Sequence, residues 1–228
     1  MFSTRSNKKE LLDEDNITKE ALFQNLKELD VINNLLGGYN ITFNALKKIV
    51  NKNTKYTLVD IGSGGGDTLK RIGKWCLRNQ IEIDLKGVDL KPICIEYSIE
   101  NNPTNIQFIC DDYRNILNHI DKVDILHASL FCHHLKDEEI TTLIKFCVTN
   151  KIILIINDLE RNAIAYYAIK FLTAIFSKSY LVKNDAPLSV LRGFKTKEWK
   201  AIIKNSGAKN YTINYKWAFR HEVIIYAK

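Results

Sequence analysis

A run of glycines between two acidic residues is the strongest chemical signal in the sequence. The segment from Val59 to Asp67 has the sequence VDIGSGGGD, with glycine at positions 62, 64, 65 and 66. Glycine has no Cβ, so such a run lets the backbone turn tightly and approach a ligand closely. If a helix follows, its first N–H groups face the same ligand. The segment therefore predicts a ligand-binding bend between a strand and a helix.

The acidic residues restrict the kind of ligand that suits this bend. The dinucleotide pattern G-x-G-x-x-G needs glycine at position 67, where this chain has Asp67. A diphosphate would also be repelled by Asp60 and Asp67, whereas a ligand with an ammonium or sulfonium charge would not. A P-loop is excluded because no Gly-Lys-Ser/Thr follows the glycines.

Further carboxylates follow the next two predicted strands. Asp89 ends the run GVD, where a carboxylate can accept both hydroxyls of a ribose; the alternative is a turn aspartate that caps the helix beginning at Pro92. Asp111 and Asp112 follow the third strand and could hold an adenine amino group. The alternative is that they cap a short helix that begins near Arg114.

Candidates for proton transfer follow the fourth and fifth strands. A phenol or acid acceptor must lose its proton to a base within hydrogen-bond reach, and His133, His134, Asp158 and Glu160 are placed for this. Either histidine could instead form a satisfied hydrogen bond that holds its loop. Arg161 could bind a substrate carboxylate or pair with Glu160. The five cysteines are widely spaced and match no ligand pattern, so we expect neither a metal site nor disulfides.

Composition limits the class of protein. With 228 residues, 46% of them hydrophobic, the chain can bury one sizeable core. No apolar run is long enough for a membrane span or a secretion signal, and we expect a cytoplasmic protein. The net charge of +7 is concentrated in the last third of the chain. This asymmetry favours an anionic partner, for example an acidic or carrier-linked substrate, a membrane surface or nucleic acid, although a solvated lysine-rich face would have the same composition.

The order of predicted elements alternates between strand and helix after a helical N-terminal region. Apolar runs without in/out alternation predict strands of a parallel sheet covered on both faces. These runs occupy residues 57–61, 83–88, 106–110, 123–128 and 151–156. Helices are predicted at about 18–36, 42–50, 67–78, 92–100, 136–148, 163–176 and 196–205. Residues 177–194 are predicted to form a loop, and residues 210–217 and 221–227 a hairpin.

Four of these segments carry a resemblance to a known family. VDIGSGGGD, GVDL, FICDDY and ILHASLFCHHL, in this order, resemble class I S-adenosylmethionine (SAM)-dependent methyltransferases over about residues 57–160. The resemblance implies an α/β fold: a Rossmann-like three-layer sandwich with a seven-stranded, mostly parallel sheet, an antiparallel C-terminal hairpin and added N-terminal helices. We expect a helical cap at residues 1–52 and a SAM-binding domain at 53–228, with an insertion at about 161–195.

The resemblance also implies roles for individual residues. Asp60 and the glycines at 62, 64 and 66 would surround the methionine part of SAM, Asp89 would bind its ribose, and Asp111 with Asp112 its adenine. The complete set of expected cofactor-binding residues is Asp60, Gly62, Ser63, Gly64, Gly66, Asp67, Asp89, Leu90, Asp111, Asp112 and Ser129. The expected catalytic residues are His133, His134 and Asp158.

A narrower resemblance concerns the acceptor. INNLLGGYNITFNAL (residues 32–46) and residues 157–199 are similar to a bacterial subgroup associated with polyketide or quinone-like aromatic products. This resemblance narrows the acceptor little. We expect methylation of a small, mostly apolar, aromatic or polyketide-like acceptor, anionic or carrier-linked among the options, at oxygen rather than carbon. The apolar helix at 163–176 could form a lid over such an acceptor or simply pack on the fold.

Other functions remain as alternatives. One is an NAD(P)-dependent oxidoreductase, and another is a non-catalytic SAM-binding module. Nucleic acid is disfavoured as the substrate because the Asn/Asp-Pro-Pro-Tyr/Phe signature of amino-directed enzymes is absent. We expect no stable membrane insertion, and the sequence leaves the oligomeric state open.

Overall fold

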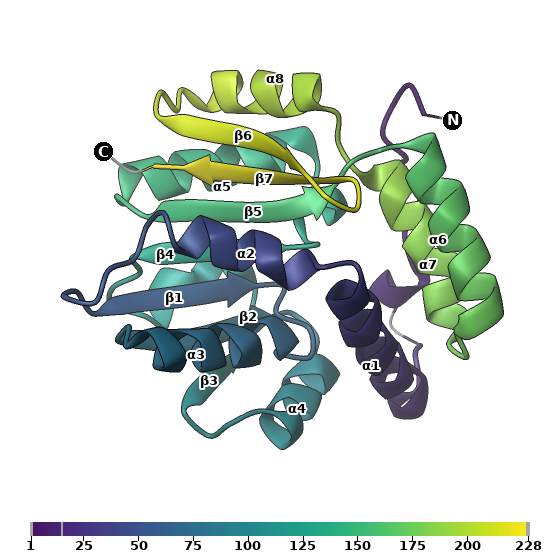
Figure 1. Ribbon diagram of the computed structural model, residues 1–228, viewed down its shortest axis with the longest axis horizontal. Coiled ribbons are helices and arrows are strands. Elements are labelled where there is room, and N and C mark those ends of the chain that lie inside the picture. The colour runs from purple at the N-terminus through teal and green to yellow at the C-terminus, as the bar shows by residue number, and fades with distance from the viewer. Residues whose placement is uncertain (1, 15, 227–228) are drawn as a thin grey trace.

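A single seven-stranded sheet organises the molecule (Figure 1). The computed structural model describes residues 2–14 and 16–226 of the chain. The strand order is β3-β2-β1-β4-β5-β7-β6. The strands are β1 (Tyr56–Ile61), β2 (Ile83–Asp89), β3 (Ile106–Cys110), β4 (Ile125–Ser129), β5 (Ile153–Leu159), β6 (Tyr211–Lys216) and β7 (Arg220–Ile225). The expected Rossmann-like fold with an antiparallel C-terminal hairpin is confirmed.

The first five strands are parallel, so their carboxyl ends lie at one edge of the sheet. β1 pairs with β2 and β4, β2 with β3, and β4 with β5, all in parallel register. β7 runs antiparallel to β5, so that Arg220 at its start pairs with Leu159 at the end of β5. Functional residues that follow β1, β2, β4 and β5 therefore meet at the same edge.

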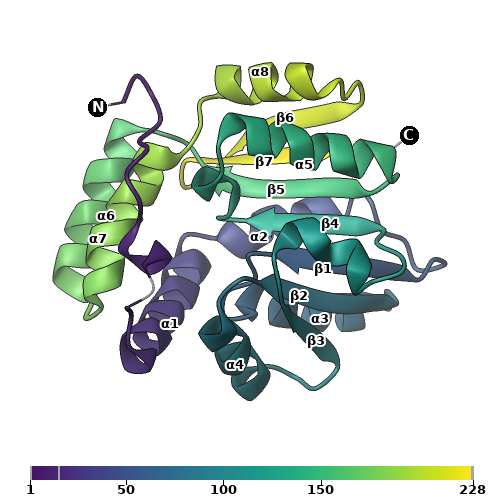
Figure 2. The same ribbon diagram turned by 180° about the vertical axis from the view of Figure 1, so that it is seen from behind.

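Helices cover both faces of the sheet. α2 (Gly38–Leu46) and α3 (Asp67–Asn79) lie on the face shown in Figure 1, and α5 (Asp137–Thr149) and α8 (Thr196–Ser206) on the face shown in Figure 2. Each pair of helices closes a core layer of buried aliphatic side chains with the strands. Burial on both faces explains why the strands have continuous apolar sequences. α4 (Pro92–Asn101) lies between β2 and β3 in the chain.

A helical group faces the carboxyl ends of the parallel strands (Figure 1). It consists of α1 (Lys19–Leu35), α6 (Ala163–Phe176) and α7 (Tyr180–Arg192), and the N-terminal segment, residues 2–14, runs along it. Within residues 2–14 and 16–226, three short 3₁₀ helices complete the fold: η1 (Leu11–Asp13), η2 (Tyr113–Asn118) and η3 (Cys132–His134). Among the described residues, no helix is long and apolar enough to cross a membrane.

Most predicted elements are present, with two differences. The helix predicted at 42–50 lies about four residues closer to the N-terminus, from Gly38 to Leu46. The prediction of a loop at 177–194 is wrong, because this segment contains α7. Pro187 lies inside α7, where it removes one backbone hydrogen bond, but Leu181, Val182 and Val190 are buried against the fold and stabilise the helix. Ala227, the last residue of the predicted hairpin, lies outside the described residues. The division at residue 52 stays a prediction.

Candidate functional site

The predicted bend, residues 62–66, lies between β1 and α3 and depends on glycine. Gly62, Gly64 and Gly66 have φ angles of 64°, 52° and 73°, which L side chains rarely adopt. Gly66 is the N-cap of α3, and a Cβ there would lie 2.6 Å from the ring of Phe108. The sequence therefore needs glycine at these positions to turn the chain and to bring it close to β3.

Asp89 holds the glycine bend to β2. One of its oxygens accepts from the backbone N–H of Gly64 at 2.9 Å and the other from that of Lys91 at 3.0 Å. Burial raises the pKa of this carboxyl above its ordinary value. The Oγ of Ser63 is buried here and has no hydrogen-bond partner among the described residues. The bend thus presents one carboxylate and one unsatisfied hydroxyl at the carboxyl end of β2.

Asp67 adds a second carboxylate at the start of α3. The hydroxyl of Tyr39 donates to Asp67 and also lies 2.7 Å from Asp30. Burial raises the pKa of Asp67 to about 6, so this group changes charge just below neutral pH. The Tyr39 contact joins the start of α2 to the glycine bend.

A buried histidine fixes Asp60, the last acidic residue of β1. His127 in β4 lies with Nδ1 2.7 Å from Asp60 Oδ1, and its Nε2 is 3.0 Å from the hydroxyl of Thr42. Both ring nitrogens therefore have partners. Sequence reasoning missed His127, because it lies within an apolar strand and no motif marks it.

The acidic pair after β3 is already engaged within the protein. Asp112 caps η2 and forms an ion pair with Arg114 at 2.5 Å, as the alternative interpretation expected. Asp111 accepts from Asn115 at 2.9 Å and lies 2.6 Å from His119. The backbone N–H of Asp111 donates to the carbonyl of Asp89, so the ends of β2 and β3 are joined. Of the other two predicted residues, Leu90 is exposed and Ser129 is half-buried.

His133 and Asp158 form a second buried histidine–carboxylate pair. His133 Nδ1 lies 2.8 Å from Asp158 Oδ1, and the backbone N–H of His133 donates to Asp158 Oδ2 at 3.1 Å. The N–H of Leu159 also donates to Asp158. Burial alone would raise the pKa of Asp158, but the charge interaction and hydrogen bonds with His133 hold it below its ordinary value. Asp158 is therefore ionised and orients the ring of His133.

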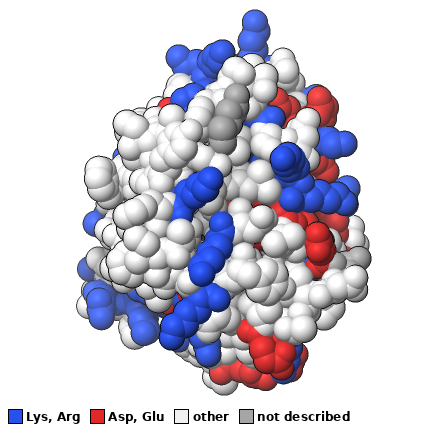
Figure 3. Space-filling view, turned by 90° about the vertical axis from the view of Figure 1, so that its right-hand side faces the viewer, with Lys and Arg blue, Asp and Glu red and all other residues white. Residues whose placement is uncertain are grey.

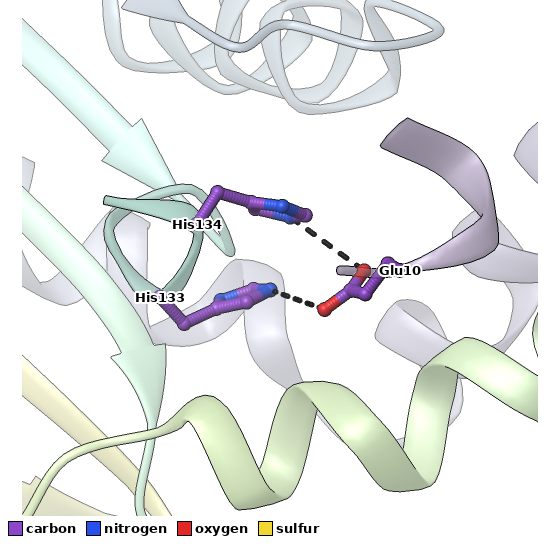
Figure 4. A group of neighbouring side chains, drawn as sticks. All are labelled: Glu10, His133 and His134. Atoms are coloured by element: carbon purple, nitrogen blue, oxygen red, sulfur yellow. Dashed lines mark ion pairs between the residues drawn. The ribbon is translucent and has the colours of Figure 1, made fainter. Parts of the chain in front are cut away.

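The N-terminal segment supplies a carboxylate to both histidines (Figure 4). Glu10 Oε1 lies 3.6 Å from His133 Nε2, and Glu10 Oε2 lies 3.7 Å from His134 Nε2. Asp13 lies 3.3 Å from His134 Nδ1. Burial raises the pKa of Glu10. Sequence reasoning missed Glu10 and Asp13, because more than a hundred residues separate them from the histidines and no local pattern indicates the contact.

Arg192 holds this cluster in place, whereas Arg161 corrects the sequence-based interpretation. Arg192 donates to the carbonyls of His133 and His134 and lies 3.4 Å from Asp13, so it is a buried structural residue. Arg161 pairs with Glu198 at 2.6 Å and not with Glu160 or an open pocket. Instead, Glu160 lies 3.4 Å from Lys195.

Three groups in this cluster have the spacing of metal ligands. The ligating atoms of Glu10, His133 and His134 all lie within 4.8 Å of one another. Arg192 Nε already lies 3.9 Å from Glu10 and supplies positive charge beside it. The expectation that no metal binds stays a prediction.

Comparisons with known proteins agree with this fold. Residues 58–149 match the model of a methyltransferase domain family. The solved structure of the plantazolicin methyltransferase BpumL with S-adenosylhomocysteine (SAH) has a TM-score of 0.63 at 18% identity, covering 92% of this chain and 95% of its own. The structure of human N-acetylserotonin methyltransferase with SAM has a TM-score of 0.63 at 12% sequence identity, and the match covers 92% of this chain and 56% of that chain. The structure of a putative O-methyltransferase from Nostoc punctiforme has a TM-score of 0.59 at 16% sequence identity, and the match covers 91% of this chain and 60% of that chain. No curated protein sequence matches the chain.

Proposed function

The chain is a SAM-dependent methyltransferase, and we propose that it methylates an oxygen of a small, mostly apolar, aromatic or polyketide-like acceptor. The observation that carries this proposal is the buried His133–Asp158 pair at the carboxyl ends of β4 and β5. A histidine oriented by a carboxylate is suited to take a proton from a hydroxyl. The methyl acceptor is therefore a group that must lose a proton, such as a phenol.

The residues at the glycine bend fit the cofactor. SAM supplies a methyl group on a positively charged sulfur when it is bound. The bend combines glycines without Cβ atoms, the unsatisfied buried Oγ of Ser63 and the carboxylates of Asp60, Asp67 and Asp89. Carboxylates suit an ammonium group and ribose hydroxyls and disfavour a diphosphate. We assign the methionine part to Asp60, Asp67 and the glycines, and the ribose to Asp89.

The adenine assignment is narrower than the sequence suggested. Asp112 caps η2 and pairs with Arg114, which leaves it poorly placed to accept from an adenine amino group. Asp111 follows β3 directly and keeps acceptor capacity beyond its contacts with Asn115 and His119. We therefore favour Asp111 as the adenine residue, with Leu90 and Ser129 as neighbours of the cofactor.

His133 would act as the general base. Asp158 keeps the proton of His133 on Nδ1, which leaves Nε2 to accept the proton of the acceptor hydroxyl. The positive charge that develops on the ring lies between Asp158 and Glu10, and both carboxylates stabilise it. His134 lies next to His133, with ring centroids 4.3 Å apart, and we assign it to positioning Glu10.

The surface around this edge suits an apolar acceptor. α6 exposes Ile164, Tyr167, Phe171, Ile175 and Phe176, and Thr173 is its one buried residue. Lys178 and Lys183, which follow this helix, are also exposed. On this side of the molecule, Lys and Arg side chains lie beside a broad uncharged area (Figure 3). Such a surface fits an apolar acceptor with an anionic group or an anionic carrier.

Mass spectrometry after incubation with SAM and a panel of phenols, quinone precursors and carrier-linked polyketides tests the proposal. We expect a mass gain of one CH₂ unit on a hydroxylated acceptor, and its loss in His133→Gln. Methylation at carbon or nitrogen would contradict the oxygen assignment. Binding of SAH without methyl transfer to any acceptor would favour a non-catalytic SAM-binding module. In that case the contact of Glu10 with His133 would explain why His133 accepts no proton. Thermal stabilisation by NADH alone would favour an oxidoreductase.

A further inference from the structure

Buried arginines of this protein are held in two different ways. Arg161, Arg192 and Arg220 are all at most 8% exposed. Arg161 pairs with Glu198 and donates to the carbonyls of Phe2, Ser3 and Gly193. Arg192 likewise combines Asp13 with backbone carbonyls. In both, the cost of burying a charge is offset by carboxylates and hydrogen bonds.

Arg220, at the start of β7, lacks these partners. Its one hydrogen bond runs from Nη1 to Asn157 Oδ1 at 3.4 Å, and its Nε has no partner among the described residues. Arg220 forms no ion pair with any other described residue. Asp158 is close enough to affect its charge, but the oxygens of Asp158 already accept from His133 and Leu159. Arginine stays protonated in proteins, so among the described residues a positive charge is buried here without an anion in direct contact.

The N-terminus of α2 lies against this guanidinium. A Cβ at Gly38, the first residue of α2, would lie 2.8 Å from Arg220 Nη1 and 1.9 Å from Asn33 Oδ1. The N-cap, Gly37, provides no side-chain cap for this nine-residue helix. Asn33 Oδ1 is itself buried and has no hydrogen-bond partner in the described part of the chain. A helix N-terminus without a cap and a buried arginine without an anion thus meet at one point, and both favour negative charge.

We propose that Arg220 and the N-terminus of α2 bind a carboxylate of a ligand. Arginine binds carboxylates in bidentate geometry, and a carboxylate would satisfy Nε and neutralise the buried charge. The assignment rests on SAM being the cofactor, because its methionyl end carries a carboxylate and an ammonium group. Tyr39, the residue after Gly38, contacts Asp67 in the acidic bend. One end of this region therefore suits the carboxylate and the other the ammonium group. A carboxylate of the acceptor is the second possible source.

Calorimetric binding of SAH and of its decarboxylated analogue tests the proposal. Wild-type protein should bind SAH about 10- to 100-fold more tightly than the analogue. Arg220→Met should lose that preference by weakening SAH and leaving the analogue unchanged, and Arg220→Lys should fall between. Arg78→Met, at an exposed position of α3, is the matched control and should bind both ligands normally. Equal weakening of both ligands in Arg220→Met would indicate general damage and overturn the proposal.

The same variants identify the source of the carboxylate. If Arg220→Met binds SAH normally but loses thermal stabilisation by benzoate or octanoate, the acceptor supplies the carboxylate. If neither response changes, the proposal is overturned, although methyl transfer, and with it the proposed function, can still be intact.

A second variant decides the question if Arg220→Met does not fold. Asn33→Asp places a carboxylate beside the guanidinium. It should raise the melting temperature of the free protein and weaken SAH more than the decarboxylated analogue. An unchanged or lower melting temperature with normal SAH binding would overturn the proposal.

Discussion

Two histidine–aspartate pairs lie at neighbouring positions of the sheet and differ in what faces the second ring nitrogen. His127–Asp60 joins β4 to β1, and His133–Asp158 joins η3 to β5, with Nδ1–Oδ1 distances of 2.7 and 2.8 Å. The Nε2 of His127 is 3.0 Å from the Thr42 hydroxyl, within hydrogen-bond distance, whereas that of His133 is 3.6 Å from Glu10, too far for a hydrogen bond. The two histidines are therefore similarly buried but differ in their chemistry. Both ring nitrogens of His127 have hydrogen-bond partners, whereas Nε2 of His133 has none among the described residues and can accept a proton.

Replacing His133 should have the largest effect on activity. His133→Gln keeps a polar side chain but cannot accept a proton at neutral pH, so kcat should fall by about 10²- to 10⁴-fold. Steady-state kinetics with an identified acceptor measures this, and SAH affinity should stay near that of wild type. If kcat of this variant stays within about threefold of wild type, far above the value expected for loss of a general base, His133 is a structural residue like His127.

Replacing His127 should act on stability instead. His127→Gln leaves the buried Asp60 without its strongest partner, which should lower the free energy of unfolding by about 2–4 kcal/mol and the melting temperature by about 5–10 °C. Thermal and urea unfolding measure this effect. A stable variant with a loss of kcat as large as that of His133→Gln would contradict the distinction between the two pairs.

The predictability of these two pairs from the sequence also differs. His133, His134 and Asp158 could be predicted because they come shortly after the apolar runs at 123–128 and 151–156, which are easy to recognise. His127 is hidden inside such a run, and Glu10 reaches the site only through tertiary packing. α7 was missed because Pro187 and the polar residues around it resemble a loop, whereas burial of its apolar residues decides the outcome. The parallel sheet covered on both faces, by contrast, follows from the order of strands and helices, and the family resemblance implied its seven strands.

Removing the Glu10 charge should have a smaller effect with opposite signs for activity and stability. Burial raises the pKa of Glu10, so the folded protein loses stability as pH rises and this carboxyl ionises. Glu10→Gln should therefore raise the melting temperature at pH 8. It should lower kcat about tenfold, because the protonated ring of His133 loses a nearby negative charge. A gain in activity would instead indicate that Glu10 blocks His133.

Asp67 should make cofactor binding depend on pH. Its pKa of about 6 lies above the ordinary value of 3.8, so the carboxyl is neutral at pH 5 and charged at pH 7.5. If it faces the ammonium group of the cofactor, SAH affinity should rise about three- to tenfold between these pH values. Asp67→Asn should remove this rise. The same replacement should stabilise the free protein at pH 7.5, because the cost of a buried charge disappears.

Metal removal should have the smallest effect. Although Glu10, His133 and His134 have ligand-like spacing, Arg192 and the two aspartates beside the histidines already balance their charge and hydrogen bonds. Treatment with a chelator should leave the melting temperature and kcat unchanged. A lower melting temperature that Zn²⁺ restores would show that this cluster binds metal and that His133 is a ligand rather than a base.

The path of the N-terminal segment has a consequence for biosynthesis. Glu10 contacts residues 133, 134 and 189, and Arg5 contacts Arg192 and Asp137. The ribosome releases these partners long after the first residues of the chain, and contacts of such sequence separation form late in folding. A nascent chain can therefore complete the glycine bend first, and it acquires its proposed catalytic centre only after Arg192 has been added.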